Sequence, residues 1–126
     1  NCWWVVDYNR QSLDSTTADR MVRRFDDIFE TCGWRVITLK YGKLQQAAFA
    51  RPGGKSLQQW IDGCPNADYA VLTFQGGAAW RARLTADIGD KPHVAELLAA
   101  HDDDALAALM TDLGGHCVET LIEAFA

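Results

Sequence analysis

The chain has 126 residues, of which 48% are hydrophobic and 23% charged, and its formal net charge is −5. This length is one domain's worth of chain, and the composition is that of an ordinary globular protein. The acidic balance argues against a nucleic-acid interface, which needs a basic face, and no apolar run approaches the roughly 20 residues that span a bilayer. The four cysteines form no C-x-x-C pair, which argues against a zinc site. Each lies beside apolar residues or a helix end, which suits reduced, buried thiols in a cytoplasmic protein.

The first third of the chain has the pattern of strand, helix and strand. Cys2–Asp7 is a short, continuous apolar run rich in aromatic and β-branched residues, typical of a buried strand. Thr16 or Thr17 can cap a helix whose apolar residues recur at three- and four-residue steps, until Gly33 ends it. Trp34–Leu39 is the second predicted strand. This order predicts a right-handed βαβ unit, and hence an α/β fold in which the two strands are parallel.

The rest of the chain is predicted to be mainly helical. Asp102–Asp104 places three carboxylates at the amino end of a helix, where the helix dipole favours them. Arg81 and Arg83 are expected on a solvated face, and Asp68–Phe74 is ambiguous because its periodicity alone favours a strand. The apolar residues expected to face inward are Leu44, Ala47, Ala48, Leu57, Trp60, Ile61, Trp80, Leu84, Val94, Leu97, Leu98, Leu106, Leu109, Met110 and Leu113.

Polar side chains follow the first predicted strand, at residues 7–11. In open α/β sheets, ligands bind beyond the carboxyl ends of the strands. Asn9 offers an amide oxygen and Gln11 a main-chain carbonyl, and such hard oxygens suit magnesium. The alternative is an Asx turn that only connects strand to helix. Since such turns are common, the pattern alone favours the turn.

The stretch VVDYNRQSLD, residues 5–14, resembles the second half of the thiamine diphosphate motif of the transketolase superfamily. The closest likeness is to its homodimeric pyruvate dehydrogenase type. The resemblance implies that Asn9 binds magnesium through its side chain and that Gln11 does so through its main-chain carbonyl. Leu13 would lie beside the cofactor, and Asp7 takes the place of an asparagine that contacts the cofactor. The Gly-Asp-Gly half of the motif would lie upstream.

The likeness continues along nearly the whole chain. FDDIFETCGWRVITLKYG (25–42) resembles the family's helix, glycine and strand, and GGKSLQQWIDGCPNADY (53–69) and GGAAWRARL (76–84) resemble its next helical segments. This order favours a helical turn at DYAVLTF. LGGHCVETLIEAF (113–125) resembles the mobile inner loop of the active site. His116 matches a catalytic histidine that assists acyl transfer, and Cys117 stands where the family has Asp.

Residues 1–126 are therefore predicted to be a fragment of the domain that binds thiamine diphosphate and Mg²⁺ in a 2-oxo acid dehydrogenase. The resemblance implies that this fragment is part of a three-layer, doubly wound α/β domain with a parallel sheet, truncated and helix-rich in its C-terminal half. The resemblance implies decarboxylation of a small 2-oxo acid such as pyruvate, acyl transfer to a lipoyl-bearing acyltransferase, and a homodimer. Both ends fall inside predicted elements and look cut, so the segment alone is expected to be inactive. Two alternatives stay open: a non-catalytic α/β interaction module, and a transketolase-like enzyme with another substrate.

Overall fold

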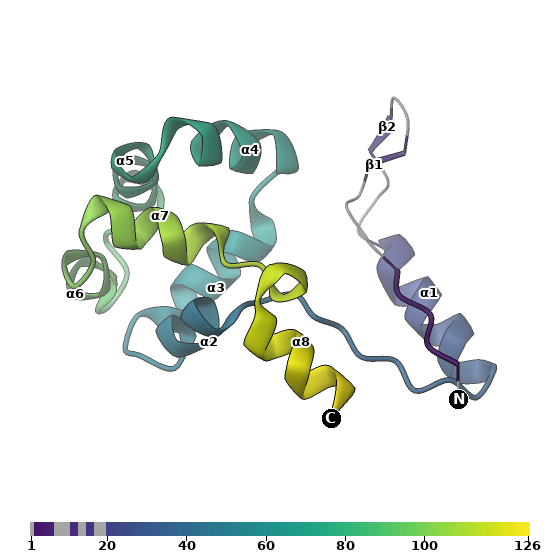
Figure 1. Cartoon of the computed structure of the whole chain (residues 1–126). Helices are drawn as coiled ribbons and strands as arrows, with labels where there is room; N and C mark the ends of the chain where they lie inside the picture. The colour runs from purple at the N-terminus through teal and green to yellow at the C-terminus, as the bar shows by residue number, and fades with distance from the viewer. Residues whose placement is uncertain (1, 7–10, 13–14, 17–19) are drawn as a thin grey trace. The chain divides into compact units, whose positions relative to one another are not determined.

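The computed structural model describes residues 2–6, 11–12, 15–16 and 20–126. The chain forms two compact units, Asn1–Thr38 and Leu39–Ala126, called unit 1 and unit 2 below. Figure 1 shows one helix beside an extended segment in unit 1, and a set of short helices in unit 2. Within the described ranges, no helix combines the length and the apolar character needed to cross a membrane.

Unit 1 is organised around helix α1, Arg20–Thr31. Gly33 follows it with φ 83°, a left-handed conformation that glycine adopts without strain and that turns the chain at a helix end. Trp4, Phe29 and Trp34 then meet edge to face, with ring centroids 5.2 Å apart for Trp4 and Phe29 and 6.1 Å apart for Phe29 and Trp34. These three residues form the tryptophan cluster, and both of its tryptophans remain exposed.

The strands of the described residues are very short. β1, Gln11–Ser12, pairs with β2, Ser15–Thr16, in an antiparallel arrangement that places Ser12 opposite Ser15. A further isolated antiparallel bridge joins Tyr41 to Leu113 in unit 2. The described residues contain no parallel pairing.

The predicted parallel βαβ unit, and with it the doubly wound α/β fold, is therefore wrong. The structure describes residues 2–6 of the first predicted strand and all of the second, Trp34–Leu39, and none of these residues belongs to a strand or a sheet. A parallel sheet is stable when helices cover both of its faces and when neighbouring strands pair with its edges. The described part of unit 1 supplies one helix, so two such strands would leave their backbone groups and one face bare.

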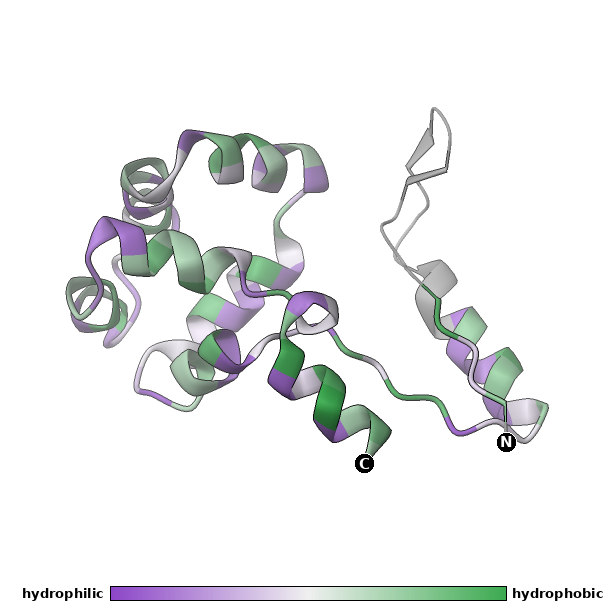
Figure 2. Cartoon of the chain, in the orientation of Figure 1, coloured by the Kyte–Doolittle hydropathy of each residue, from purple (hydrophilic) through white to green (hydrophobic). Residues whose placement is uncertain are grey.

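Unit 2, all of whose residues are described, is helical. Its elements are α2 (Lys43–Phe49), α3 (Gly54–Gly63), α4 (Asn66–Gln75), α5 (Gly77–Ile88), α6 (Val94–Ala99), α7 (Asp103–Thr111), the 3₁₀ turn η1 (Gly114–His116) and α8 (Val118–Phe125). Figure 2 shows hydrophobic and hydrophilic residues alternating around these helices. The hydrophobic residues enclose one core, built from Ala48, Leu57, Leu72, Trp80, Leu84, Ile88, Val94, Leu97, Leu98, Leu106, Leu109 and Met110.

The centre of this core lies where α5 packs on α7. Gly77, the first residue of α5, permits the contact because a Cβ there would come within 1.8 Å of the main-chain oxygen of Asp103. Arg81 then binds the Asp103 carboxylate at 2.6 Å and the main-chain oxygens of Leu98 and His101 at 2.9 and 2.7 Å. The prediction that Arg81 is merely solvated is therefore wrong, since its guanidinium joins α5 to the helices on either side of residue 101.

Several helical predictions for unit 2 are confirmed. DYAVLTF lies in α4, so the resemblance gave the right structure and the periodicity alone did not. Asp102 is the N-cap of α7, and its carboxylate accepts a hydrogen bond from the Ala105 N–H at 2.8 Å. The face predicted for α2 is correct only at Ala48, because Leu44 and Ala47 are exposed and Gln45 is buried instead.

Candidate functional site

Three of the four residues predicted to hold the cofactor or magnesium, Asp7, Asn9 and Leu13, lie outside the described residues. The fourth, Gln11, lies in β1, where only its backbone is described. The two predicted magnesium donors are the side-chain amide oxygen of Asn9 and the main-chain carbonyl of Gln11, which have the hard oxygen character that Mg²⁺ prefers. The donor set thus fits magnesium chemically, and the placement of these residues at a site stays a prediction.

The segment before this motif differs from the predicted buried strand. Residues 2–6 are extended, and each of their side chains is exposed. Among the residues that the structure describes, no three His, Cys, Asp or Glu side chains come together as a metal-binding group. The residues that directly precede the predicted cofactor motif are therefore exposed to solvent and not buried in a sheet.

His116, the predicted catalytic residue, lies in the turn η1 between α7 and α8. The loop that carries it is joined to the chain just before α2, because the Gly42 N–H donates to the Asp112 main-chain oxygen at 2.8 Å and the Gly114 N–H to that of Lys40 at 3.1 Å. The side chain of His116 is exposed. An anchored backbone thus presents this imidazole to solvent.

Cys117, which follows His116, is the N-cap of α8. The Thr120 hydroxyl, the Lys43 N–H and the Thr120 N–H lower the pKa of the Cys117 thiol, against smaller opposing effects of burial and of the Asp112 carboxylate. The side chain of Cys117 makes no capping hydrogen bond to α8. The sequence analysis treated Cys117 only as a replacement for Asp. The stretch Cys117–Thr120 lacks the Ser or Thr, followed three residues later by Glu or Gln, that defines a capping box, so the sequence offered no signal for this environment.

The predicted burial of the thiols is correct for Cys64 but wrong for Cys2 and Cys32, which are exposed, while Cys117 is half-buried. All four cysteines lie in the described residues, and no disulfide joins them. Cys117 is therefore neither the most exposed thiol nor the most buried one, and what sets it apart is the lowered pKa of its thiol.

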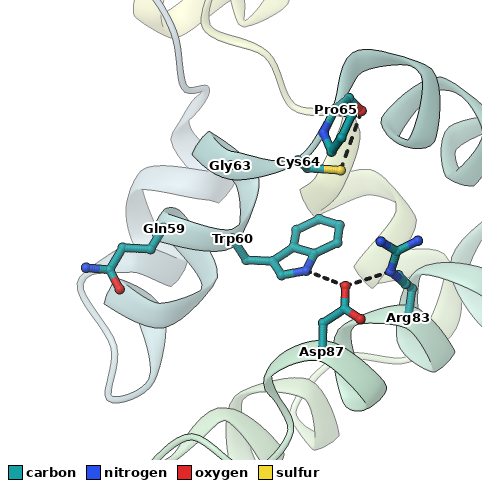
Figure 3. Close-up of a pocket in the computed structure, with 7 residues that line it drawn as sticks. All are labelled: Gln59, Trp60, Gly63, Cys64, Pro65, Arg83 and Asp87. Atoms are coloured by element: carbon teal, nitrogen blue, oxygen red, sulfur yellow. Dashed lines mark hydrogen bonds and ion pairs between the residues drawn. The ribbon is translucent and has the colours of Figure 1, made fainter.

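A shallow hollow of about 280 Å³ lies beside α3 and α5 (Figure 3). Figure 3 shows the Asp87 carboxylate between two donors, Trp60 Nε1 at 2.8 Å and Arg83 Nε at 2.6 Å. The bonds from Arg83 and from Trp60 hold the pKa of Asp87 below its usual value. Both donors bind the same carboxylate oxygen of Asp87, so this carboxylate links Trp60 of α3 to α5. We assign these hydrogen bonds a role in stability and none in catalysis.

No protein-family model matches the chain, and no solved structure matches it. Among curated proteins, the pyruvate dehydrogenase E1 component of Escherichia coli K12 is 28% identical over 127 residues, which cover 99% of this chain and 14% of that protein. The E1 component of Haemophilus influenzae Rd is 28% identical over 128 residues, with 100% and 14% covered. The chain thus spans about 14% of the length of these relatives. It is similar, over nearly its whole length, to one segment of pyruvate dehydrogenase E1 components.

Proposed function

We propose that the chain is a segment of a pyruvate dehydrogenase-type E1 component that decarboxylates a small 2-oxo acid with thiamine diphosphate. The observation that carries this proposal is the similarity to E1 components over 99% of the chain. The match of residues 5–14 to the second half of the cofactor motif supports it. Within the longer protein, residues 1–126 would contribute that half of the motif and the inner active-site loop.

The motif residues would hold the diphosphate end of the cofactor. Asn9 would bind Mg²⁺ through its side-chain oxygen and Gln11 through its main-chain oxygen, so that the metal neutralises phosphate charge. Leu13 would pack against the cofactor, and Asp7 would lie beside it. Thiamine diphosphate, when bound, supplies the electron sink that decarboxylation of a 2-oxo acid requires.

His116 would serve the later step, in which the acyl group passes to the lipoyl group of an acyltransferase partner. A flexible carrier from another protein needs a group that it can reach, and the exposed imidazole on an anchored loop meets this need. Imidazole exchanges a proton near neutral pH, as transfer to a dithiolane sulfur requires. We infer that a second subunit of a homodimer would complete the site.

The test of the motif uses the full-length protein that contains this chain, supplied with pyruvate, thiamine diphosphate and Mg²⁺, and measures carbon dioxide release with an artificial electron acceptor. Asn9→Ala removes one metal ligand and should lower the rate at least about a hundredfold. Gln11→Ala keeps the main-chain carbonyl and should keep most of the activity. Undiminished turnover by Asn9→Ala would remove Asn9 from the site, and a wild-type protein inactive on every 2-oxo acid would favour the non-catalytic alternative.

The same preparation separates decarboxylation from acyl transfer. His116→Ala should spare carbon dioxide release with the artificial acceptor and should lower the lipoyl-coupled rate by about a hundredfold or more, the usual scale for a lost proton-transfer group. His93→Ala is the matched control, because His93 is also exposed but lies before α6. Equal losses in both assays would contradict this division of roles.

A further inference from the structure

Asp112 places a carboxylate at the end of α7, where that helix does not favour one. It is the C-cap residue of α7. The carboxyl end of a helix carries partial negative charge, so a further negative charge there is unfavourable. A stabilising contact for this carboxylate therefore has to come from outside α7.

The start of α2 supplies that contact. The N–H of Leu44, in the first turn of α2, donates to Asp112 Oδ2 at 2.7 Å. Gly42, the N-cap residue of α2, has no side chain that could accept this bond. Amides in the first turn of a helix lack partners within the helix and carry partial positive charge, so a carboxylate acceptor is favourable there. Asp112 thus supplies, from a distant part of the sequence, the cap that Gly42 cannot provide.

Gly42 leaves the space that this carboxylate occupies. A Cβ at Gly42 would lie 2.2 Å from Asp112 Oδ2 and 2.4 Å from Asp112 Oδ1, closer than two such atoms can approach. Gly42 has φ −78° and ψ 177°, an extended conformation that any residue adopts. Its backbone therefore does not require glycine, whereas its contact with Asp112 does.

The first turn of α2 holds both sides of the loop that carries His116. On one side, the main-chain oxygen of Asp112 also accepts the Gly42 N–H, at 2.8 Å. On the other side, the Lys43 ammonium pairs with Glu123 of α8. The Glu123 carboxylate is 65% exposed, and exposed ion pairs contribute little, whereas a hydrogen bond to a carboxylate is about twice as strong as a neutral one. Asp112 therefore makes the stronger of the two attachments.

We propose that Asp112 is a positioning residue for His116. Its carboxylate binds the start of α2, and this bond fixes residues 112–117 so that the imidazole meets the lipoyl group in one orientation. The inference rests on the proposed function, because it deepens the role given there to His116. In this role Asp112 acts on acyl transfer only through His116.

The test uses the full-length protein and measures both carbon dioxide release with the artificial acceptor and the lipoyl-coupled rate. Asp112→Ala should lower the coupled rate about ten- to a hundredfold, and carbon dioxide release much less, because a displacement of about 1 Å can cost that much in rate. Asp112→Asn keeps an oxygen that can accept the Leu44 N–H and should restore most of the coupled rate. Asp104→Ala is the matched control, because its carboxylate, at the other end of α7, bonds to none of the described residues.

Double variants show whether Asp112 acts through these two contacts. Gly42→Ala leaves Asp112 unchanged but displaces its carboxylate, so it should cause the same loss as Asp112→Ala. Adding Gly42→Ala to Asp112→Ala should then cause little further loss, because one contact is removed twice. Adding Asp112→Ala to His116→Ala should also cause little further loss. Additive losses in either double variant would contradict the proposal.

Hydrogen exchange separates the structural role of Asp112 from the proposed function. The amides of Gly42, Leu44 and Gly114 should exchange about tenfold faster in Asp112→Ala, and unchanged exchange would refute the attachment. Unchanged coupled rates in Asp112→Ala and Gly42→Ala, beside a large loss in His116→Ala, would remove the positioning role and leave the E1 function standing. A wild-type protein with no lipoyl-coupled rate would instead overturn the E1 function and, with it, the role of Asp112 in acyl transfer.

A variant that does not fold leaves the proposal testable. If circular dichroism shows that Asp112→Ala is unfolded, Gly42→Ala and Asp112→Asn decide between them. Gly42→Ala should lose most of the lipoyl-coupled rate, and Asp112→Asn should keep most of it. Equal coupled rates in these two variants would overturn the proposal.

Discussion

The two units use aromatic residues in opposite ways. In unit 2, Trp80 is 0% exposed and meets Tyr69 and Trp60 edge to face, inside a core supplied by several helices. In unit 1, Trp4 and Trp34 make similar edge contacts, yet they are 67% and 36% exposed. The difference shows that edge contacts between rings do not by themselves form a core. A core needs side chains that cover the ring from several directions, because hydrophobic stabilisation scales with the apolar area removed from water.

The largest expected effect, and the most direct test of this difference in burial, comes from truncating one tryptophan in each unit. Trp80→Ala leaves a large cavity and should lower the free energy of unfolding by about 3–5 kcal/mol. Trp34→Ala removes the edge-to-face contacts of a partly exposed ring and should lower the free energy of unfolding by only about 0.5–1.5 kcal/mol. Urea unfolding of the chain, followed by circular dichroism, measures both values. Equal costs would mean that the tryptophan cluster is as well enclosed as the core.

A second, smaller effect comes from Tyr69, whose hydroxyl donates to the main-chain oxygen of Met110. Burial, with a smaller contribution from Cys64, raises the pKa of Tyr69 to about 12. The unfolded chain loses this proton near pH 10 and the folded chain keeps it, so stability falls as pH rises from about 10 to 12, by at most about 1.4 kcal/mol per pH unit. Tyr69→Phe should remove that part of the slope, as unfolding at several alkaline pH values would measure. An unchanged slope would show that the phenol is open to solvent.

The smallest expected effect concerns the start of α7. Asp102→Ala removes the hydrogen bond to the Ala105 N–H and should cost about 1 kcal/mol. Asp104→Ala, in the same first turn but outside the cap position, should cost only a few tenths of that value. Thermal unfolding of the two variants gives the comparison. A larger loss for Asp104 would mean that the dipole, rather than the cap bond, holds this end of the helix.

Much of unit 2 was predictable because its helices carry their own signals. Trp80 and Leu84 recur at helical spacing, and both are fully buried. Leu113 was placed on the inner face of α7, but the helix ends at Thr111, and Leu113 instead bridges to Tyr41 and is exposed. The periodicity of a local sequence cannot predict such pairing between segments that lie far apart in the chain.

Unit 1 was harder to predict because a strand forms only when another strand, from a different part of the sequence, pairs with its backbone. Cys2–Val6 has the composition of a buried strand, but composition cannot say whether a neighbour is present to pair with it. For the site, the resemblance of residues 5–14 to the cofactor motif carried the hypothesis, because the pattern around Asn9 and Gln11 alone favoured a turn. The lowered pKa of Cys117 depends on Thr120 and also on the N–H of Lys43, 74 positions earlier in the sequence, and a local pattern cannot show such a distant neighbour.

The bonds that anchor the His116 loop bear on how this part of the chain opens. Gly42 and Gly114 both donate across to the opposite segment, and Tyr41 bridges to Leu113 between them. Because the contacts lie side by side, losing one weakens its neighbours, and the two segments should separate as one cooperative unit. The loop that carries His116 and the segment before α2 should therefore open together in one local unfolding event. A single free energy of local unfolding then describes both segments.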